Sequence, residues 1–513
     1  MGGWKFVIIS FMEKGNQRNR ETKMNVIVNE KLKTPLYRQI ATQIKDAIIK
    51  GEILDGFPVL SERDMARMTG VHRNTVRRAY NDLEGEGLIQ ARHGVGYVVT
   101  YATSEKPKEQ TGGKRRIKKV NWSNMIKDEY LDQERMFDDL FSKSYEEGKI
   151  SFAGGTSSSE IYDEKNIAEA LAKTLSKGNS SYFYTPYQGD YSLRQNLSGF
   201  MRGKGVLAAP SEIQILSETN QALDFIVTLL LSTGDKVITE EAVSPDVYRA
   251  IELAGGIIIC VPMDEEGMIT DNLAPLIEKH NPKFIYVNST YHDPTSVQLS
   301  LKRRRQLVSL SSQYRIPIIE DDASSELAFE GDRLPPIKAF DEGNNVIYIY
   351  SFGLTFVPGI SIAFVAATKE IIKGLSYLVS VRLVNLDWIS QKLLDNYLED
   401  GTYERKLIDF REEYKQKRDT MCAWIENSGL EIAFQKPTGG VYLWCKLPDE
   451  VDIQKLSKAA NRQGVSFIPG SVFYPQKNQQ GNYIRLNYSH ATIGEINKGM
   501  SILIELIKGL SKI

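Results

Sequence analysis

Basic and amide side chains line one face of a predicted helix over residues 72–86. Arg73 and Arg77 are four residues apart, as are Asn74 and Arg78, so each pair lies one above the other on the helix surface. A helix fits the major groove of DNA, where an arginine can hold guanine O6 and N7 with two hydrogen bonds. The alternative is a solvated basic face on an ordinary helix, and the surrounding elements favour DNA recognition.

The elements that would position this helix lie within residues 33–100. A first helix is predicted by apolar residues at helical spacing, which are Leu36, Ile40, Ile44, Ala47 and Ile48. Ser61 is typical of a residue that caps a helix start, and Gly70 turns the chain into the recognition helix. The inward stripe of that helix consists of Val76, Ala79, Tyr80 and Leu83. A strand-like segment over 88–99 predicts a hairpin, so we expect a winged helix-turn-helix.

Further contacts with DNA are expected beside the arginines. Hydroxyl groups and the first-turn amides of a helix attract phosphate. Glycines at the hairpin tip let a wing approach the DNA backbone closely. The predicted DNA-binding residues are Ser61, Arg63, His72, Arg73, Asn74, Thr75, Arg77, Arg78, Gly94 and Gly96.

Residues 150–513 alternate between short β-branched runs and helical stretches. This alternation predicts an α/β fold with a mostly parallel sheet. Its seven strands are expected at 213–217, 236–239, 256–261, 284–288, 316–320, 346–350 and 361–366. In such sheets ligands bind at the carboxyl ends of the strands, where Asp321 and the segment after Tyr350 fall. From about residue 395, a long charged helix, short strands and a final amphipathic helix predict a smaller α+β domain.

Five segments make up the predicted organisation of the chain. They are an N-terminal tail over 1–30, a DNA-binding domain over 31–100, a basic linker over 101–150, a large domain over 151–395 and a small domain over 396–513. The tail is expected to be disordered, or to precede the start used in the cell. The linker is either a solvated connector or a basic strap that adds non-specific attraction to DNA.

Composition narrows the classes of function. The chain has 64 Lys and Arg against 65 Asp and Glu, which excludes a globally basic nucleic-acid binder but allows a local basic patch. Cys260, Cys422 and Cys445 are widely spaced, so neither a disulfide scaffold nor a cysteine zinc site fits, and we expect a reducing, cytoplasmic compartment. No apolar run approaches the roughly 18 residues that a membrane span needs. We therefore expect no metal site and no membrane association.

The N-terminal module resembles the DNA-binding domain of the GntR family. The resemblance rests on Pro35–Ile40, Gly51–Ile53, Leu60–Arg63, Val71–Val76, Ala79–Tyr80, Leu83–Ile89 and Gly94–Val98. His72 departs from the family, which often has serine there. The resemblance implies a dimer on paired half-sites of double-stranded operator DNA.

The remainder resembles the fold-type-I aminotransferase domain, and the combination is typical of MocR-type regulators. The landmarks are Tyr184–Gly189, Asn220–Asp224, Gly234–Asp235, Asp293–Thr295, Ile319–Asp322, Tyr350–Phe352, Pro358–Gly359 and Ile484–Asn487. The resemblance implies pyridoxal 5'-phosphate as the family cofactor, held as a Schiff base by a lysine.

Several residues around the family's cofactor differ in this sequence. Leu354 stands at the lysine position, so we expect neither a covalently bound cofactor nor a catalytic residue. Ser361 replaces a phosphate-binding arginine, and Glu218 replaces a glycine of the phosphate site. Asp293 replaces an asparagine and Ala323 a tyrosine. The expected effector pocket, or degenerate cofactor pocket, comprises Ser217, Glu218, Thr219, Asp293, Asp321, Ala323, Ser351, Leu354, Ser361 and Arg485.

Two family positions keep their residues. Asp321 stands where the family binds the pyridine nitrogen, and Arg485 where it grips a substrate carboxylate. Alternatively, Asp321 merely ends a buried strand and Arg485 forms an internal ion pair. The sequence predicts a transcription regulator, not an enzyme, whose aminotransferase-like domain dimerises and senses a small effector, an amino acid or another carboxylate. Two alternatives stay open. One is a regulator that binds pyridoxal phosphate non-covalently, or a pyridoxal-phosphate-dependent aminotransferase-like enzyme, and the other is a dimerisation scaffold without a ligand.

Overall fold

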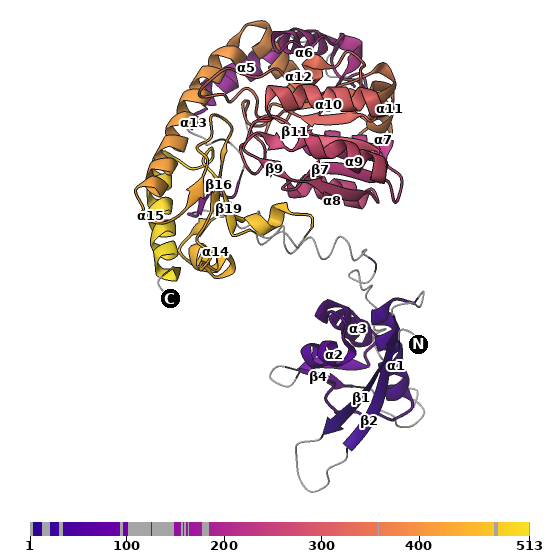
Figure 1. The fold of residues 1–513 in the computed structure, drawn as a ribbon. Helices are drawn as coiled ribbons and strands as arrows, with labels where there is room; N and C mark the ends of the chain where they lie inside the picture. Colours follow the sequence, from indigo (N-terminus) through magenta and orange to yellow (C-terminus); the bar gives the residue numbers. More distant parts are fainter. Residues whose placement is uncertain are drawn as a thin grey trace. The chain divides into compact units, whose positions relative to one another are not determined.

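The computed structural model describes residues 4–12, 21–29, 34–92, 96–100, 125, 148–154, 157, 161–162, 164–176, 184–357, 359–476 and 481–511. The chain divides into two compact units, Met1–Arg135 and Met136–Ile513 (Figure 1). Most of the predicted linker over 101–150 lies outside the described residues. No helix among the described residues is long and apolar enough to cross a membrane.

The smaller unit contains the predicted winged helix-turn-helix. Its helices are α1 (Leu36–Ile49), α2 (Glu62–Thr69) and α3 (Arg73–Gly85), and the antiparallel strands β3 (Ile89–Arg92) and β4 (Gly96–Val99) form the wing. The Ser61 hydroxyl accepts a hydrogen bond from the Asp64 amide at 3.1 Å and caps α2. Gly70, with φ of 66°, ends α2 in the left-handed conformation that glycine adopts without strain. The predicted apolar stripe of α3 is buried, and the residues of its opposite face are partly or fully exposed.

In place of the expected tail, the N-terminal segment contains an antiparallel hairpin of β1 (Trp4–Met12) and β2 (Glu21–Asn29). Strand β2 lies on α1, where the Gln39 side chain accepts a hydrogen bond from the Asn29 amide at 2.9 Å. The Gln43 side chain does the same for the Ile27 amide at 2.9 Å. A local pattern could not reveal that β2 packs on α1, because amides of β2 bond to side chains of a separate helix.

The larger unit is built on a seven-stranded sheet. In spatial order the strands are β6 (Ile213–Leu216), β14 (Ala363–Ala366), β13 (Val346–Ser351), β12 (Ile318–Asp321), β11 (Phe284–Asn288), β7 (Lys236–Glu240) and β8 (Ile257–Val261). Strand β14 is antiparallel to both neighbours, and the other pairs are parallel. The predicted mostly parallel sheet is therefore confirmed.

Helices cover both faces of this sheet. One face carries α7 (Thr219–Leu230), α8 (Pro245–Leu253) and α11 (Lys369–Arg382). The other carries α6 (Tyr191–Gly203), α9 (Leu273–His280), α10 (Leu301–Tyr314) and α12 (Trp388–Glu399). Successive side chains of a strand point to opposite faces. Asp321 accordingly meets Tyr286 on the α7 face, whereas Asp322 meets Tyr348 on the α6 face.

A smaller α+β domain completes this unit, as predicted. The long helix α13 (Thr402–Glu426) leads to the sheet β15 (Ala433–Phe434), β16 (Tyr442–Lys446), β19 (Tyr483–Asn487) and β18 (Ile468–Pro469), in that order. Helices α14 (Ile453–Arg462) and α15 (Ile493–Leu510) pack beside it. The remaining elements are α5 (Glu164–Ser176), β9 (Met263–Asp264), β10 (Gly267–Met268) and the parallel pair β5 (Ile150–Ser151) and β17 (Val465–Ser466).

Candidate functional site

Glu62 holds the two predicted arginines of the recognition helix. Its carboxylate accepts hydrogen bonds from Nε of Arg73 at 3.0 Å and from Nε of Arg77 at 3.0 Å. A second bond from Arg77, Nη2 to Oε2 at 3.1 Å, makes that pair bidentate. Burial of Glu62 opposes ionisation, but the hydrogen bonds from Arg77 and Arg73 outweigh it and lower the pKa of Glu62. Arg73 keeps half of its side chain exposed, so it is the better placed of the two to reach DNA.

Arg78 turns toward the first helix of the module. Its guanidinium carbon lies 4.0 Å from the centre of the Tyr37 ring, a stacked cation–π geometry. Helical spacing alone predicts an outward side chain. A hollow of about 300 Å³ beside it is lined by Pro35, Leu36, Tyr37, His72, Asn74, Thr75 and Arg78. The start of α1 and the start of α3 thus share one polar recess, and the contact of these residues with DNA stays a prediction.

Of the other predicted DNA-binding residues, some make hydrogen bonds within the chain and others are exposed. His72 caps α3, because its Nδ1 accepts a hydrogen bond from the Asn74 amide at 3.3 Å. Ser61 is engaged with Asp64, as described above, and Arg63 is exposed. Gly96 has a φ of 94°, and Gly94 lies outside the described residues.

In the larger unit, Asp321 ends β12 with a buried carboxyl group. Tyr286 donates to its Oδ2 at 2.9 Å, and the Ala323 amide lies 3.3 Å from its Oδ1. Burial raises the pKa of Asp321 to about 6 against the opposing hydrogen bond from Tyr286. The side chain of Asn288, which sequence reasoning missed, donates to the Asp321 carbonyl and accepts from the Asp293 amide, and so joins the two predicted residues.

Arg485 on β19 forms the internal ion pair that the sequence left as an alternative. Its Nη1 lies 2.6 Å from Oδ1 of Asp293, and its Nη2 donates to the Ala153 carbonyl at 2.9 Å. The Tyr442 ring centre is 4.3 Å from the guanidinium carbon. Burial alone would lower the pKa of Arg485, but the Asp293 carboxylate raises it. Two predicted pocket residues therefore form an ion pair, while Nε of Arg485 is buried without a hydrogen-bond partner among the described residues.

Asp246 is a further acid of this group that the sequence did not single out. It lies in the first turn of α8, close enough to Asp293 and Arg485 for their charges to act on it. Burial raises the pKa of Asp246, a hydrogen bond from Asn220 opposes this, and Asp293 raises the pKa further. An acid in the first turn of the helix that follows strand β7 is the sequence signal that could have found it.

Glu218 places a carboxylate beside the N-terminus of α7. It precedes the first helical residue, Thr219, but accepts no hydrogen bond from its own helix. Instead its Oε2 accepts from the Ser351 hydroxyl at 3.0 Å, and that hydroxyl also accepts from the Gly353 amide at 3.1 Å. A helix N-terminus favours an anion. The chain itself supplies the anion there.

Leu354 lies in the loop after β13 and is partly buried against the apolar core of the small domain. Its carbonyl accepts hydrogen bonds from the Tyr414 hydroxyl at 3.3 Å and from the Ser157 hydroxyl at 3.4 Å. Ser361 is partly buried just before β14, and Ser217 is exposed after β6. The structure thus brings Glu218 to Ser351 and Asp293 to Arg485, with an aliphatic side chain at position 354.

Two family models match this chain in separate regions. The model described as aminotransferase class I and II matches residues 152–503. The model described as bacterial regulatory proteins, gntR family, matches residues 36–99. Both resemblances drawn from the sequence are thereby confirmed.

Similar proteins fall into two kinds. The uncharacterized HTH-type transcriptional regulator YisV of Bacillus subtilis is 27% identical over 489 residues, which cover 94% of this chain and 98% of that regulator. Aromatic-amino-acid aminotransferase 1 of Thermococcus litoralis is 30% identical and covers 70% of this chain and 88% of its own length. The crystal structure of the multiple substrate aminotransferase from Thermococcus profundus has a TM-score of 0.70 at 26% identity and covers 77% of this chain and 100% of its own.

Proposed function

This chain belongs to the class I and II aminotransferase family and carries a GntR-type DNA-binding domain before it, and we propose that its family domain senses an effector and dimerises instead of catalysing. The domain order is that of a MocR-type transcription regulator. The observation that carries the proposal is Leu354, whose aliphatic side chain stands where the resemblance places the family's lysine. A leucine can neither form a Schiff base nor shuttle a proton.

The residues around Leu354 do not fit pyridoxal phosphate. Glu218 sets a carboxylate at the N-terminus of α7, where the cofactor's phosphate would need positive or neutral partners. Asp293 is already committed to Arg485. A buried lysine, Lys204, does lie near the end of β12, but its ammonium is 3.0 Å from Glu326 on the opposite face of the sheet from Asp321. These contacts support a regulator that works without the family cofactor.

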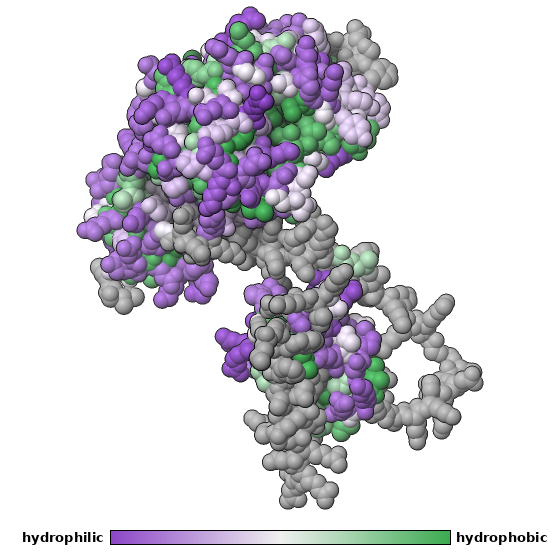
Figure 2. Space-filling view, turned by 45° about the vertical axis from the view of Figure 1, so that its right-hand side comes forward, coloured by the Kyte–Doolittle hydropathy of each residue, from purple (hydrophilic) through white to green (hydrophobic). Residues whose placement is uncertain are grey.

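Dimerisation is supported by an apolar surface on the larger unit. Tyr184, Tyr377, Val381 and Val384 are 77%, 66%, 56% and 60% exposed. The Thr185 hydroxyl bonds to the Asn385 side chain at 3.0 Å, which sets the two segments side by side. Figure 2 shows hydrophobic residues gathered on one face of this unit. Exposed apolar patches of this kind mark protein interfaces, and we infer that a second copy of this chain covers this one.

The dimer gives the DNA domains their function. Two copies of α3 would read the two half-sites of a double-stranded operator, since dimeric helix-turn-helix proteins bind symmetric sites. An effector would act by binding one arrangement of the dimer more tightly than another. Such a regulator acts on the chromosome, so we place it in the cytoplasm.

A second candidate, a dimerisation scaffold without a ligand at the degenerate pocket, has its own support. Arg485 is the residue that would grip an effector carboxylate, and Asp293 already occupies it at 2.6 Å. A ligand carboxylate entering there would have to displace a buried ion pair.

The test is an absorbance titration of the purified full chain with pyridoxal phosphate, followed by borohydride reduction and mass spectrometry. We expect no saturable aldimine band and no lysine fixed by reduction. A band that saturates, with one lysine labelled, would refute the assignment of Leu354. It would show that a lysine of this chain binds pyridoxal phosphate covalently. Selection of bound sequences from random duplex DNA tests the regulator independently, and enrichment of a two-fold symmetric site is expected.

A further inference from the structure

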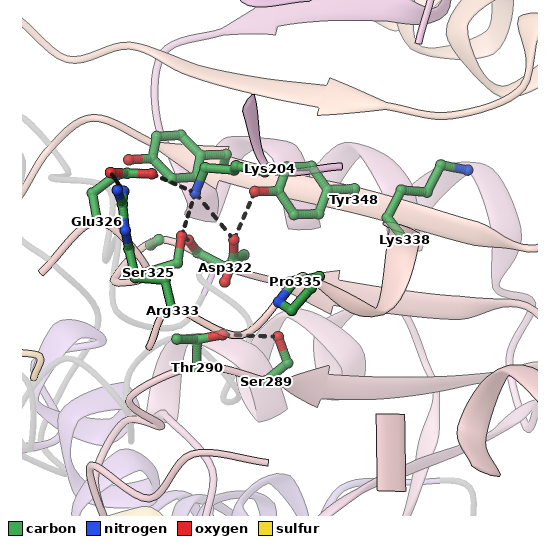
Figure 3. Close-up of polar contacts among 12 residues, drawn as sticks. Lys204, Ser289, Thr290, Asp322, Ser325, Glu326, Arg333, Pro335, Lys338 and Tyr348 are labelled. Carbon is green, nitrogen blue, oxygen red and sulfur yellow. Dashed lines mark hydrogen bonds and ion pairs between the residues drawn. The ribbon is translucent and has the colours of Figure 1, made fainter. Parts of the chain in front are cut away.

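A cluster of ionised side chains lies on the face of the sheet opposite Asp321. Glu326, which follows β12, is the acceptor for three cations: Lys204 at 3.0 Å, Arg333 at 2.6 Å and Arg411 at 2.9 Å. Figure 3 shows Lys204 pointing toward Ser325 and Asp322 while Arg333 reaches Glu326. Nothing in the sequence pattern groups these residues, because they come from three separate segments: the end of α6, the loop after β12 and helix α13.

Lys204 is the buried member of the cluster and is fully engaged. Its three ammonium protons face the Ser325 hydroxyl, the Glu326 carboxylate and, at 3.6 Å, the Asp322 carboxylate. It also lies 4.6 Å from the centre of the Tyr350 ring. Lys204 therefore contributes positive charge to the cluster but has no donor left for a ligand.

The two arginines differ from Lys204 because they keep unused donors. Nη1 of Arg333 and Nη2 of Arg411 bond to the same oxygen of Glu326, and Nε of Arg411 bonds to the Glu326 carbonyl. Arg333 has five N–H protons, and its Nε and Nη2 have no bonding partner among the described residues. The same holds for Nη1 of Arg411. Their side chains are 54% and 25% exposed, so these donors face solvent.

A cavity of about 500 Å³ opens onto this cluster between α6, α12 and α13. Its wall includes the cations Lys204, Arg333 and Arg411, the carboxylates of Glu326 and Glu404, the amide side chain of Asn196 and the apolar Phe200 and Leu407. The size is within the range of about 300–1,000 Å³ typical of small-molecule sites. Burial would raise the pKa of Glu326, yet Lys204, Arg333 and Arg411 outweigh it and lower that pKa, as expected in a region of positive potential.

We propose that this cavity binds a small organic carboxylate, held by the unused N–H groups of Arg333 and Arg411 with its apolar part against Phe200 and Leu407. Arg333 and Arg411 already hold the Glu326 carboxylate together, and both line the cavity with N–H groups to spare. Guanidinium N–H groups suit a carboxylate, whose two oxygens accept charge-assisted hydrogen bonds. A bound carboxylate would tie the loop after β12 to helix α13. The inference deepens the effector-sensing role and rests on it for the regulatory consequence, but the binding itself can be measured without DNA.

The test uses the full chain and fluorine NMR titrations with two carboxylates of different size, trifluoroacetate and 4-fluorobenzoate. The matched probe 4-fluorobenzamide has nearly the same shape but no charge. We expect saturable binding of at least one carboxylate, with the amide at least about tenfold weaker than the acid of the same shape. Arg333→Gln and Arg411→Gln should each weaken carboxylate binding about fivefold or more.

Two variants serve as controls. Arg305→Gln removes an exposed arginine of α10 that stacks on Phe340 outside the cavity, and it should leave binding unchanged. Arg485→Ala removes the arginine of the degenerate pocket instead and so tests that pocket as the alternative carboxylate site. Absence of saturable binding of both carboxylates overturns the proposal, as does binding that Arg485→Ala abolishes and Arg333→Gln preserves. A chain that binds carboxylate here but selects no operator would refute the regulator and leave the cavity assignment intact.

Discussion

Glu62 shows what helical spacing can and cannot predict about single residues. The four-residue spacing of Arg73 and Arg77 correctly placed them on the same face of α3, because spacing reflects the geometry of one helix. It could not reveal that an acid at the start of α2 holds both arginines. In the same way, the sequence predicted Arg485 and Asp293 as pocket residues and left an internal ion pair of Arg485 open. It could not name Asp293 as the partner, since strand β19 and the loop after β11 meet only in the fold.

Replacing Glu62 with glutamine should loosen the orientation of the two arginines. The freed guanidinium groups would gain phosphate contacts, so affinity for non-specific duplex should rise a few-fold while discrimination of the selected operator falls about tenfold. Fluorescence anisotropy with operator and scrambled duplexes measures both quantities. Glu52→Gln, the same charge change at an exposed position of this module, should leave the ratio unaltered. If Glu62→Gln kept full discrimination, the arginines would not read bases through this pairing.

Asp321 should make the stability of the larger unit depend on pH. The pKa of Asp321 in the folded chain is about 6, which lies above its ordinary value near 3.8. The contribution of Asp321 to the free energy of unfolding is therefore fully present below about pH 4 and is lost as pH rises through 6. The loss is about 3 kcal/mol by pH 7. Asp321→Asn should therefore raise the thermal midpoint more at pH 8 than at pH 5. Exposed Asp332→Asn is the control, and equal effects of Asp321→Asn at both pH values would refute the burial argument.

At the scale of helices and strands, the spacing of apolar residues predicted the sheet but not the close contacts around it. The seven strands, the long charged helix α13 and the amphipathic helix α15 could be predicted because β-branched runs and helical spacing are local patterns. The hairpin β1–β2 could not, and neither could the approach of the chain at Gly439 to Tyr291 and Leu327. A β-carbon at Gly439 would lie 2.2 Å from Cζ of Tyr291 and 2.4 Å from the Leu327 carbonyl oxygen.

Gly439→Ala should consequently destabilise the larger unit. The new methyl group must displace backbone as well as a ring, which costs about 1–3 kcal/mol or more. Chemical denaturation followed by tryptophan fluorescence would report it, since Trp444 lies on the neighbouring strand β16. Gly199→Ala is the matched control, because nothing lies within 4 Å of the added carbon inside α6, and alanine should stabilise that helix by up to about 1 kcal/mol. If Gly439→Ala left the free energy of unfolding unchanged, the loop before β16 would accommodate the methyl group without cost.

For the whole molecule, the resemblance of two separate regions to known families identified the architecture, and long-range contacts had to come from the structure. The landmarks of the aminotransferase domain fixed the order of elements and hence the degenerate pocket. The sequence could not predict the carboxylate-binding cavity, because its charged residues follow no motif; they are Lys204, Glu326, Arg333 and Arg411. The exposed apolar surface of the larger unit could not be predicted either, since the sequence does not say which apolar side chains stay exposed in the fold.

The exposed residues Tyr377 and Val381 of α11, together with Val384, should therefore decide the oligomeric state. Val384 holds a φ of 66°, a left-handed conformation that costs a β-branched residue about 1–3 kcal/mol and persists only where the surroundings impose it. A Tyr377→Glu, Val381→Glu double variant buries two charges in the inferred interface, so sedimentation velocity should show a dimer turned into monomer. Leu207→Glu, at a still more exposed leucine outside this surface, should stay dimeric. Because a monomer contacts one half-site, operator affinity should fall by two orders of magnitude or more with its two-fold preference. A double variant that remained dimeric would place the interface elsewhere and leave the strain at Val384 unexplained.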